Sequence, residues 1–116
     1  MMKDNLIKNK TFQFSLSIIS LYKQLIEEKE FILSKQLLRS ATSVGANVVE
    51  AEAGVSRADF IAKMGIASKE ARETKYWLQL LKEGKLTKSN LEEFLNEIDA
   101  IIRIITSIVK TAKENI

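Results

Sequence analysis

Apolar residues recur along this chain at alternating steps of four and three positions, in four separate runs. Such steps average about 3.5 residues and keep one side of a helix facing its neighbours at a shallow crossing angle. The third run shows the pattern most fully, at Phe60, Met64, Ala67, Ala71, Thr74, Leu78 and Leu81. The runs predict one domain, residues 1–116, with helices over about residues 7–28, 34–53, 57–83 and 88–114.

Short breaks containing residues that end or start helices separate the runs. Gly54 and Gly84 stand where the second and third helices should end, as C-terminal caps. Ser56 and Asp59 have the spacing of a capping box at the start of the third helix, and Thr87 is the expected N-cap of the fourth. Because short loops make consecutive helices antiparallel, the sequence predicts an all-α fold, an up-down-up-down antiparallel four-helix bundle.

The fourth and first runs each carry a second apolar stripe. A helix in a four-helix bundle needs only one apolar face, and a monomer rarely exposes a second. The stripes therefore either form a contact between subunits or belong to one wide face turned toward the core. The first reading, which we take as the prediction, places at a subunit interface Phe94, Ile101, Ile104 and Ile108 of the fourth run, and Phe12 and Ile19 of the first.

The second predicted helix is rich in small residues, and Gly45 in its interior indicates that a neighbouring backbone comes close. Beside its apolar side runs a polar seam made of Gln36, Ser40, Ser43, Asn47 and Glu50. Three readings are open: a solvated face, a hydrogen-bond network that fixes the register between helices or subunits, or a ligand site. For the network, Arg72 and Lys75 of the next helix are the expected partners.

Composition removes much of enzyme chemistry. The chain has no His and no Cys, which excludes the usual general base, thiolate nucleophiles, disulfides and the commonest zinc ligands. We expect no enzymatic activity, no metal site and no cofactor. No apolar stretch is long enough for a membrane span, and the first residues lack the apolar run of a signal peptide. A cytoplasmic protein with no membrane partner is therefore expected.

Positive charge is concentrated in the predicted third helix and the loop after it. Residues 57–88 contain eight basic and four acidic residues, within a net charge of +3 for the chain. A basic surface could bind nucleic-acid phosphates, but it could equally be a solvated face with pairs four residues apart, such as Lys69 with Glu73. No stacking aromatic is evident beside this charge, since Trp77 is expected to pack between helices. The residues predicted to contact nucleic acid are Arg39, Arg57, Lys63, Lys69, Arg72 and Lys75.

The second predicted helix also carries a recognisable motif. It resembles the second-helix signature of the bacterial proteins encoded in intervening sequences of 23S ribosomal RNA genes, with matches at Gln36, Arg39, Ser43, Ala46, Asn47 and Glu50. The chain departs from the family at Gly45, where Pro is frequent, at Ala51, where Gly is frequent, and at Leu38, where a second basic residue is common. The resemblance implies a four-helix bundle that assembles as a homopentamer. A related group, the accessory variability determinants of diversity-generating retroelements, works with a reverse transcriptase and nucleic acid.

Two functions of different classes follow. The first is a non-catalytic homo-oligomer, with a pentamer favoured, which binds rRNA, another nucleic acid or a nucleic-acid enzyme through its basic surface. The second is a structural or protein-interaction module that has no nucleic-acid role. Modest net charge and wide apolar stripes favour the second, whereas the family resemblance and the basic third helix favour the first.

Overall fold

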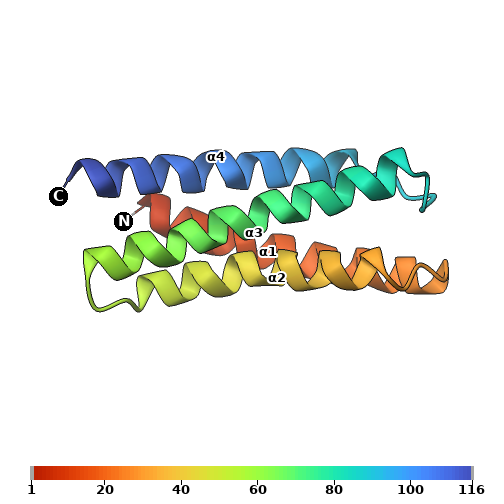
Figure 1. Ribbon diagram of the computed structural model, residues 1–116, viewed down its shortest axis with the longest axis horizontal. Helices are drawn as coiled ribbons and strands as arrows, with labels where there is room; N and C mark the ends of the chain where they lie inside the picture. Colours follow the sequence, from red (N-terminus) through yellow and green to blue (C-terminus); the bar gives the residue numbers. More distant parts are fainter. Residues whose placement is uncertain (1, 116) are drawn as a thin grey trace.

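The chain folds into four antiparallel helices (Figure 1). A computed structural model describes residues 2–115, with the side chains of residues 5–115. The two chain ends and the α2–α3 connection lie at one end of the bundle, and the other two connections lie at the opposite end. The helices are α1 (Met2–Glu27), α2 (Leu33–Glu52), α3 (Arg57–Glu83) and α4 (Glu92–Glu114).

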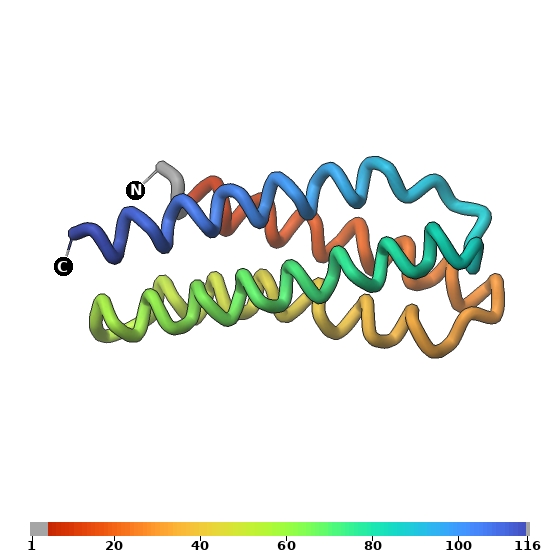
Figure 2. Tube along the Cα trace, turned by 45° about the horizontal axis from the view of Figure 1, so that its top comes forward, coloured from red at the N-terminus to blue at the C-terminus, as the bar shows by residue number. Residues whose placement is uncertain are grey.

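The bundle is an elongated rod of 47 × 20 × 20 Å. Each helix packs against two neighbours: α1 and α3 each contact both α2 and α4 (Figure 2). The predicted apolar positions fill the space between the helices; in α3, for example, Met64, Ala67, Ala71 and Leu78 are fully buried. The up-down-up-down four-helix bundle predicted from the sequence is confirmed.

The apolar face of α4 is a correction to the prediction. Ile101 and Ile108, assigned to a subunit interface, lie in the core of this same chain and are 0 % and 6 % exposed. Phe94 and Ile104 are partly buried and pack against the same core. Because α4 touches both α1 and α3, a wide arc of its surface is covered, and its two stripes form one broad core-facing side.

The second stripe of α1 behaves differently. Phe12 and Leu16 remain 60 % and 46 % exposed on the single chain, while Ile19 and Ile26 are half-buried. This part of α1 therefore presents apolar side chains to the outside of the bundle, as the sequence predicts.

The helix ends agree with the prediction at some places and differ at others. The Ser56 side chain accepts a hydrogen bond from the Asp59 backbone N–H at 3.0 Å, as a capping box requires. Gly84 caps α3, but with a right-handed backbone at φ −78°. The left-handed residues are instead Lys85 at φ 54° and Lys29 at φ 66°. After each, the next N–H bonds a carbonyl five residues back, which closes the end of α3 and of α1.

The start of α4 is a second correction, because the helix begins at Glu92 and not near residue 88. Thr87 is engaged elsewhere: its hydroxyl donates to Glu28 Oε1 at 2.6 Å, and Lys88 N–H donates to Glu28 Oε2 at 3.0 Å. These two hydrogen bonds lower the pKa of the Glu28 carboxyl below its ordinary value. They tie together the two loops at one end of the bundle.

We predict that Lys85→Gly stabilises the fold. A side chain in the left-handed region costs roughly 1–2 kcal/mol, whereas glycine adopts this conformation freely. Urea unfolding should show a free energy of unfolding about 1 kcal/mol higher for Lys85→Gly than for Lys85→Ala, which removes the same charge but keeps the strained backbone. Equal stabilities of the two variants would contradict the left-handed backbone at this position.

Candidate functional site

The polar seam of α2 is divided between the core, the next helix and solvent. Ser40 is fully buried, and its Oγ lies 2.8 Å from Oγ1 of the equally buried Thr74 on α3. Half-buried Asn47 donates from Nδ2 to the Ser43 carbonyl at 2.9 Å, within its own helix. Gln36 is exposed. The seam therefore contributes to the contact between α2 and α3.

The partners of this seam differ from those expected. Glu50 forms an ion pair with Lys63 at 3.3 Å, not with Arg72 or Lys75. Lys75 turns toward the other neighbour of α3 and pairs with Asp99 of α4 at 2.8 Å. Sequence spacing gave the face of each helix, but it could not give the rotation of α3 between α2 and α4.

Arg39 of α2 spans two carboxylates of α3. Its guanidinium lies 2.6 Å from Glu73 Oε1 and 3.3 Å from Glu70 Oε2. The hydrogen bond to Glu73, assisted by the nearby charge of Glu70, raises the pKa of Arg39 above its ordinary value. Arg39 therefore holds the two acidic groups of α3 against α2, and its own charge is largely compensated.

The predicted basic residues thus fall into two groups. Arg39, Lys63 and Lys75 are neutralised by carboxylates of neighbouring helices, and the Arg57 guanidinium donates to the backbone carbonyl of Asn115. The remaining two, Lys69 and Arg72, have exposed side chains with no ion-pair partner in the part of the chain that the structure describes. Of the six predicted residues, these two are the ones with no hydrogen bond or ion pair to another residue in the described part of the chain.

An exposed aromatic residue, which was missed in the sequence, lies beside these two cations. Tyr76 is 54 % exposed and follows Lys69 and Arg72 at steps of three and four along α3, so the three side chains share one side of the helix. We call Lys69, Arg72 and Tyr76 the outward face of α3. The neighbouring Trp77 packs against the core, as expected. The spacing of the three residues, together with the expected packing of Trp77, was the available signal that Tyr76 points outward.

Toward the N-terminus of α3, the same side of the helix carries mainly small side chains. Ala58, Ala62 and Gly65 are exposed there, and Ile66 is 42 % exposed. A Cβ added to Gly65 would meet nothing within 4 Å. The fold itself therefore gives no steric reason for a glycine at this position.

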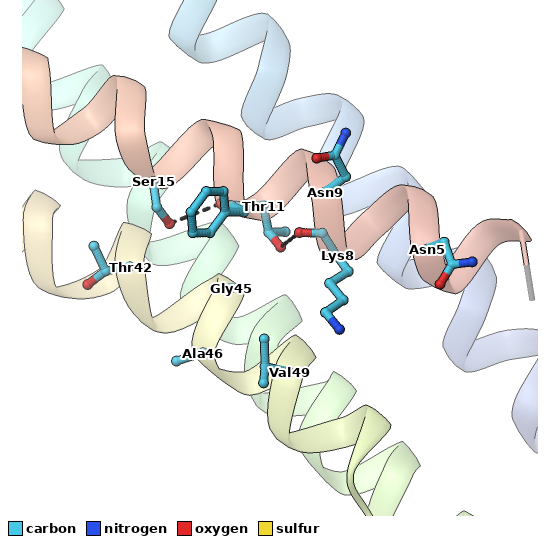
Figure 3. A pocket seen from close by; sticks show the side chains of 10 residues that line it. Asn5, Lys8, Asn9, Thr11, Ser15, Thr42, Gly45, Ala46 and Val49 are labelled. Carbon is cyan, nitrogen blue, oxygen red and sulfur yellow. Dashed lines mark hydrogen bonds between the residues drawn. The ribbon is translucent and has the colours of Figure 1, made fainter.

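A groove of about 560 Å³ lies between α1 and α2 (Figure 3). Thr11, Phe12 and Ser15 line it from α1, and Gly45 and Val49 from α2. A Cβ on Gly45 would lie 3.5 Å from the Thr11 carbonyl oxygen, which is an ordinary contact. The two helices therefore come close here, as the small residues of α2 predict. Phe12 and the half-exposed Val49 present apolar surface at the groove.

The described residues contain no group of three or more Asp or Glu side chains placed to hold a metal ion. The carboxylates of Glu50, Glu70, Glu73 and Asp99 are each paired with a cation, whereas that of Glu28 accepts hydrogen bonds from Thr87 and Lys88. Within the described part of the chain, no helix is both long and apolar enough to cross a membrane.

The fold and these surfaces define a class of protein: a bundle of four antiparallel helices with a charged face on α3 and an exposed apolar surface along α1 and α2. The family of 23S rRNA-intervening sequence proteins matches residues 3–107, and this chain belongs to that family. No match was found among curated proteins. A crystal structure of a protein of unknown function from the S23 ribosomal protein family, from Bacteroides thetaiotaomicron, is similar at 50 % identity and a TM-score of 0.89. The alignment covers 93 % of this chain and 98 % of that one.

Proposed function

We propose that this chain is a non-catalytic, cytoplasmic bundle protein that works as a homo-oligomer and binds RNA or another nucleic acid through α3. The observation that carries the proposal is the pair of exposed cations, Lys69 and Arg72, which lie one turn apart and have no carboxylate partner in the described part of the chain. Membership of a family linked to 23S rRNA intervening sequences also supports it. No cofactor is needed for this role.

The chemistry of the proposed contact is simple phosphate binding. Lys and Arg side chains neutralise phosphates and release condensed counterions, so that affinity falls as salt rises. Two contacts from one subunit give weak binding. Several subunits that hold one strand at the same time would raise the overall affinity, because each further contact is intramolecular.

Self-association is supported by the apolar surface that α1 and α2 leave exposed. Phe12, Leu16 and Val49 are each about half exposed and lie along or next to the α1–α2 groove. A second copy that covers this surface would remove it from water, at roughly 25 cal/mol for each Å² buried. We propose this surface, with Phe12 and Ile19, as the contact between subunits, and the family resemblance favours a pentamer.

A second candidate function is a protein-interaction module without a nucleic-acid role. The specific observation in its favour is that Arg39, Lys63 and Lys75 are compensated by the protein's own carboxylates. The basic surface is therefore smaller than its sequence suggests. In this alternative the partner is a protein, including a nucleic-acid enzyme, and Lys69 and Arg72 only aid solubility.

We predict that the double variant Lys69→Glu/Arg72→Glu loses binding to RNA. Replacing two attractive charges by two repulsive ones should lower the affinity for a structured rRNA fragment at least about tenfold at low salt, and each lost phosphate contact should reduce the salt slope by about one. Fluorescence anisotropy at two salt concentrations measures both quantities.

The matched control is Lys110→Glu/Lys113→Glu, which makes the same change in net charge on exposed positions of α4. It should bind nearly as well as the unaltered protein. If both double variants lose binding equally, the effect belongs to net charge and not to α3. If the unaltered protein shows no binding at low salt, the protein-interaction alternative replaces this proposal.

We also predict that Phe12→Ser reduces the mass of the assembly. Phe12 is 60 % exposed on the single chain, so the substitution should leave the fold intact while it removes apolar contact area between subunits. Sedimentation equilibrium measures the mass, and Phe31→Ser, at a similarly exposed aromatic outside the groove, serves as the control. An unchanged mass for Phe12→Ser would rule out the α1–α2 surface as the subunit contact.

A further inference from the structure

Tyr76 is an exposed aromatic residue on a long helix. It is 54 % exposed, lies within the 27-residue helix α3 and is not part of the apolar core. The ring packs edge-to-face with Trp77, with centroids 5.2 Å apart and planes at 62°. An edge-to-face contact of this kind steadies the Tyr76 ring while it leaves ring surface open to solvent.

Both cations of the outward face lie on the N-terminal side of this ring along the helix axis. With a rise of about 1.5 Å per residue, Arg72 lies roughly 6 Å and Lys69 roughly 10 Å along α3 from Tyr76. The nearest carboxylates on α3, Glu70 and Glu73, are both held by Arg39 on the α2 side. The remaining exposed acid on this side of the helix, Glu83, lies two turns beyond Tyr76. Two uncompensated positive charges thus precede the aromatic ring along the helix.

The bare stretch of α3 before Lys69 leaves room for an extended ligand. A mid-helix glycine costs about 1 kcal/mol relative to alanine, and Gly65 has only open space where its Cβ would be. With Ala58 and Ala62 on the same side, the helix surface is low and apolar. A base or a sugar can therefore lie directly against it.

We propose that the outward face of α3 binds unpaired nucleotides, with one base stacked on Tyr76 and the adjoining phosphates on Lys69 and Arg72. This inference rests on the proposed nucleic-acid function and names its ligand class. In a duplex the base faces are already stacked and cannot reach a protein ring, whereas single strands and loops present free faces. Phosphate contacts alone would not distinguish the two forms.

The test compares two labelled probes, a 12-nucleotide oligouridylate and a 12-base-pair RNA duplex, with the whole protein at low salt. The single strand should bind more tightly than the duplex. Tyr76→Ala should weaken single-strand binding by about 5- to 150-fold, the range given by the loss of one stacked base, and should leave duplex binding unchanged. Tyr76→Phe, which keeps the ring, should bind both probes as the unaltered protein does.

A local signal separates stacking from an indirect effect. Trp77 is the only tryptophan and touches Tyr76, so oligouridylate should change its fluorescence in the unaltered protein and in Tyr76→Phe, but not in Tyr76→Ala. Phe31→Ala removes an aromatic of similar exposure, 55 %, from the α1–α2 loop and should leave both binding and fluorescence response intact.

The outcomes distinguish this inference from the function on which it rests. If both probes bind equally and Tyr76→Ala changes neither, the stacking inference is overturned, while phosphate binding by Lys69 and Arg72 still stands. If Phe31→Ala weakens binding of the single strand as much as Tyr76→Ala does, Tyr76 is not the stacking residue. If neither probe binds, both the inference and the proposed function fail.

Discussion

Close packing between α2 and α3 is the constraint on which the rest of the molecule depends. Both helices bury small side chains, among them Ala41 of α2 and Ala67 and Ala71 of α3, all fully buried. They let the helices approach closely enough for Ser40 and Thr74 to share a hydrogen bond in the core. Each hydroxyl also lies near a carbonyl of its own helix, Leu37 for Ser40 at 3.3 Å and Glu70 for Thr74 at 2.8 Å, so both stay hydrogen-bonded in the core. The contact places one side of α3, the side that carries Thr74, against α2.

The rotation of α3 decides which of its charges are available. Arg39 forms ion pairs with the carboxylates of Glu70 and Glu73 on the side of α3 that faces α2. On the other side of α3, Lys75 forms an ion pair with Asp99 of α4. These ion pairs are partly exposed and add little stability, on the order of 0–1 kcal/mol each. Their larger effect is on the distribution of charge: Lys75 is compensated, while Lys69 and Arg72 keep their charge on one side of the helix, next to Tyr76.

Much of this architecture could be predicted from the sequence, because the periodicity of apolar residues depends only on helix geometry. The buried positions of α3 and the Ser56 cap were found in this way. The width of the buried face of α4 could not be predicted, because it depends on the contact of α4 with two neighbouring helices. Ile101 and Ile108 were therefore misassigned. Lys85 was missed because its left-handed backbone is imposed by the loop, against the preference of the residue. Ion pairs between helices depend on rotations that no local pattern encodes.

The central claim is that the outward face of α3 is the part of this bundle that meets nucleic acid. Ultraviolet crosslinking of oligouridylate to the unaltered protein, followed by mass spectrometry of the peptides, tests it directly, because crosslinks form only where a base touches a side chain. We predict that the crosslinked residue is Tyr76, in the tryptic peptide of residues 76–82. Crosslinks at Phe12 or Phe31 in its place, with α3 unmodified, would contradict the account.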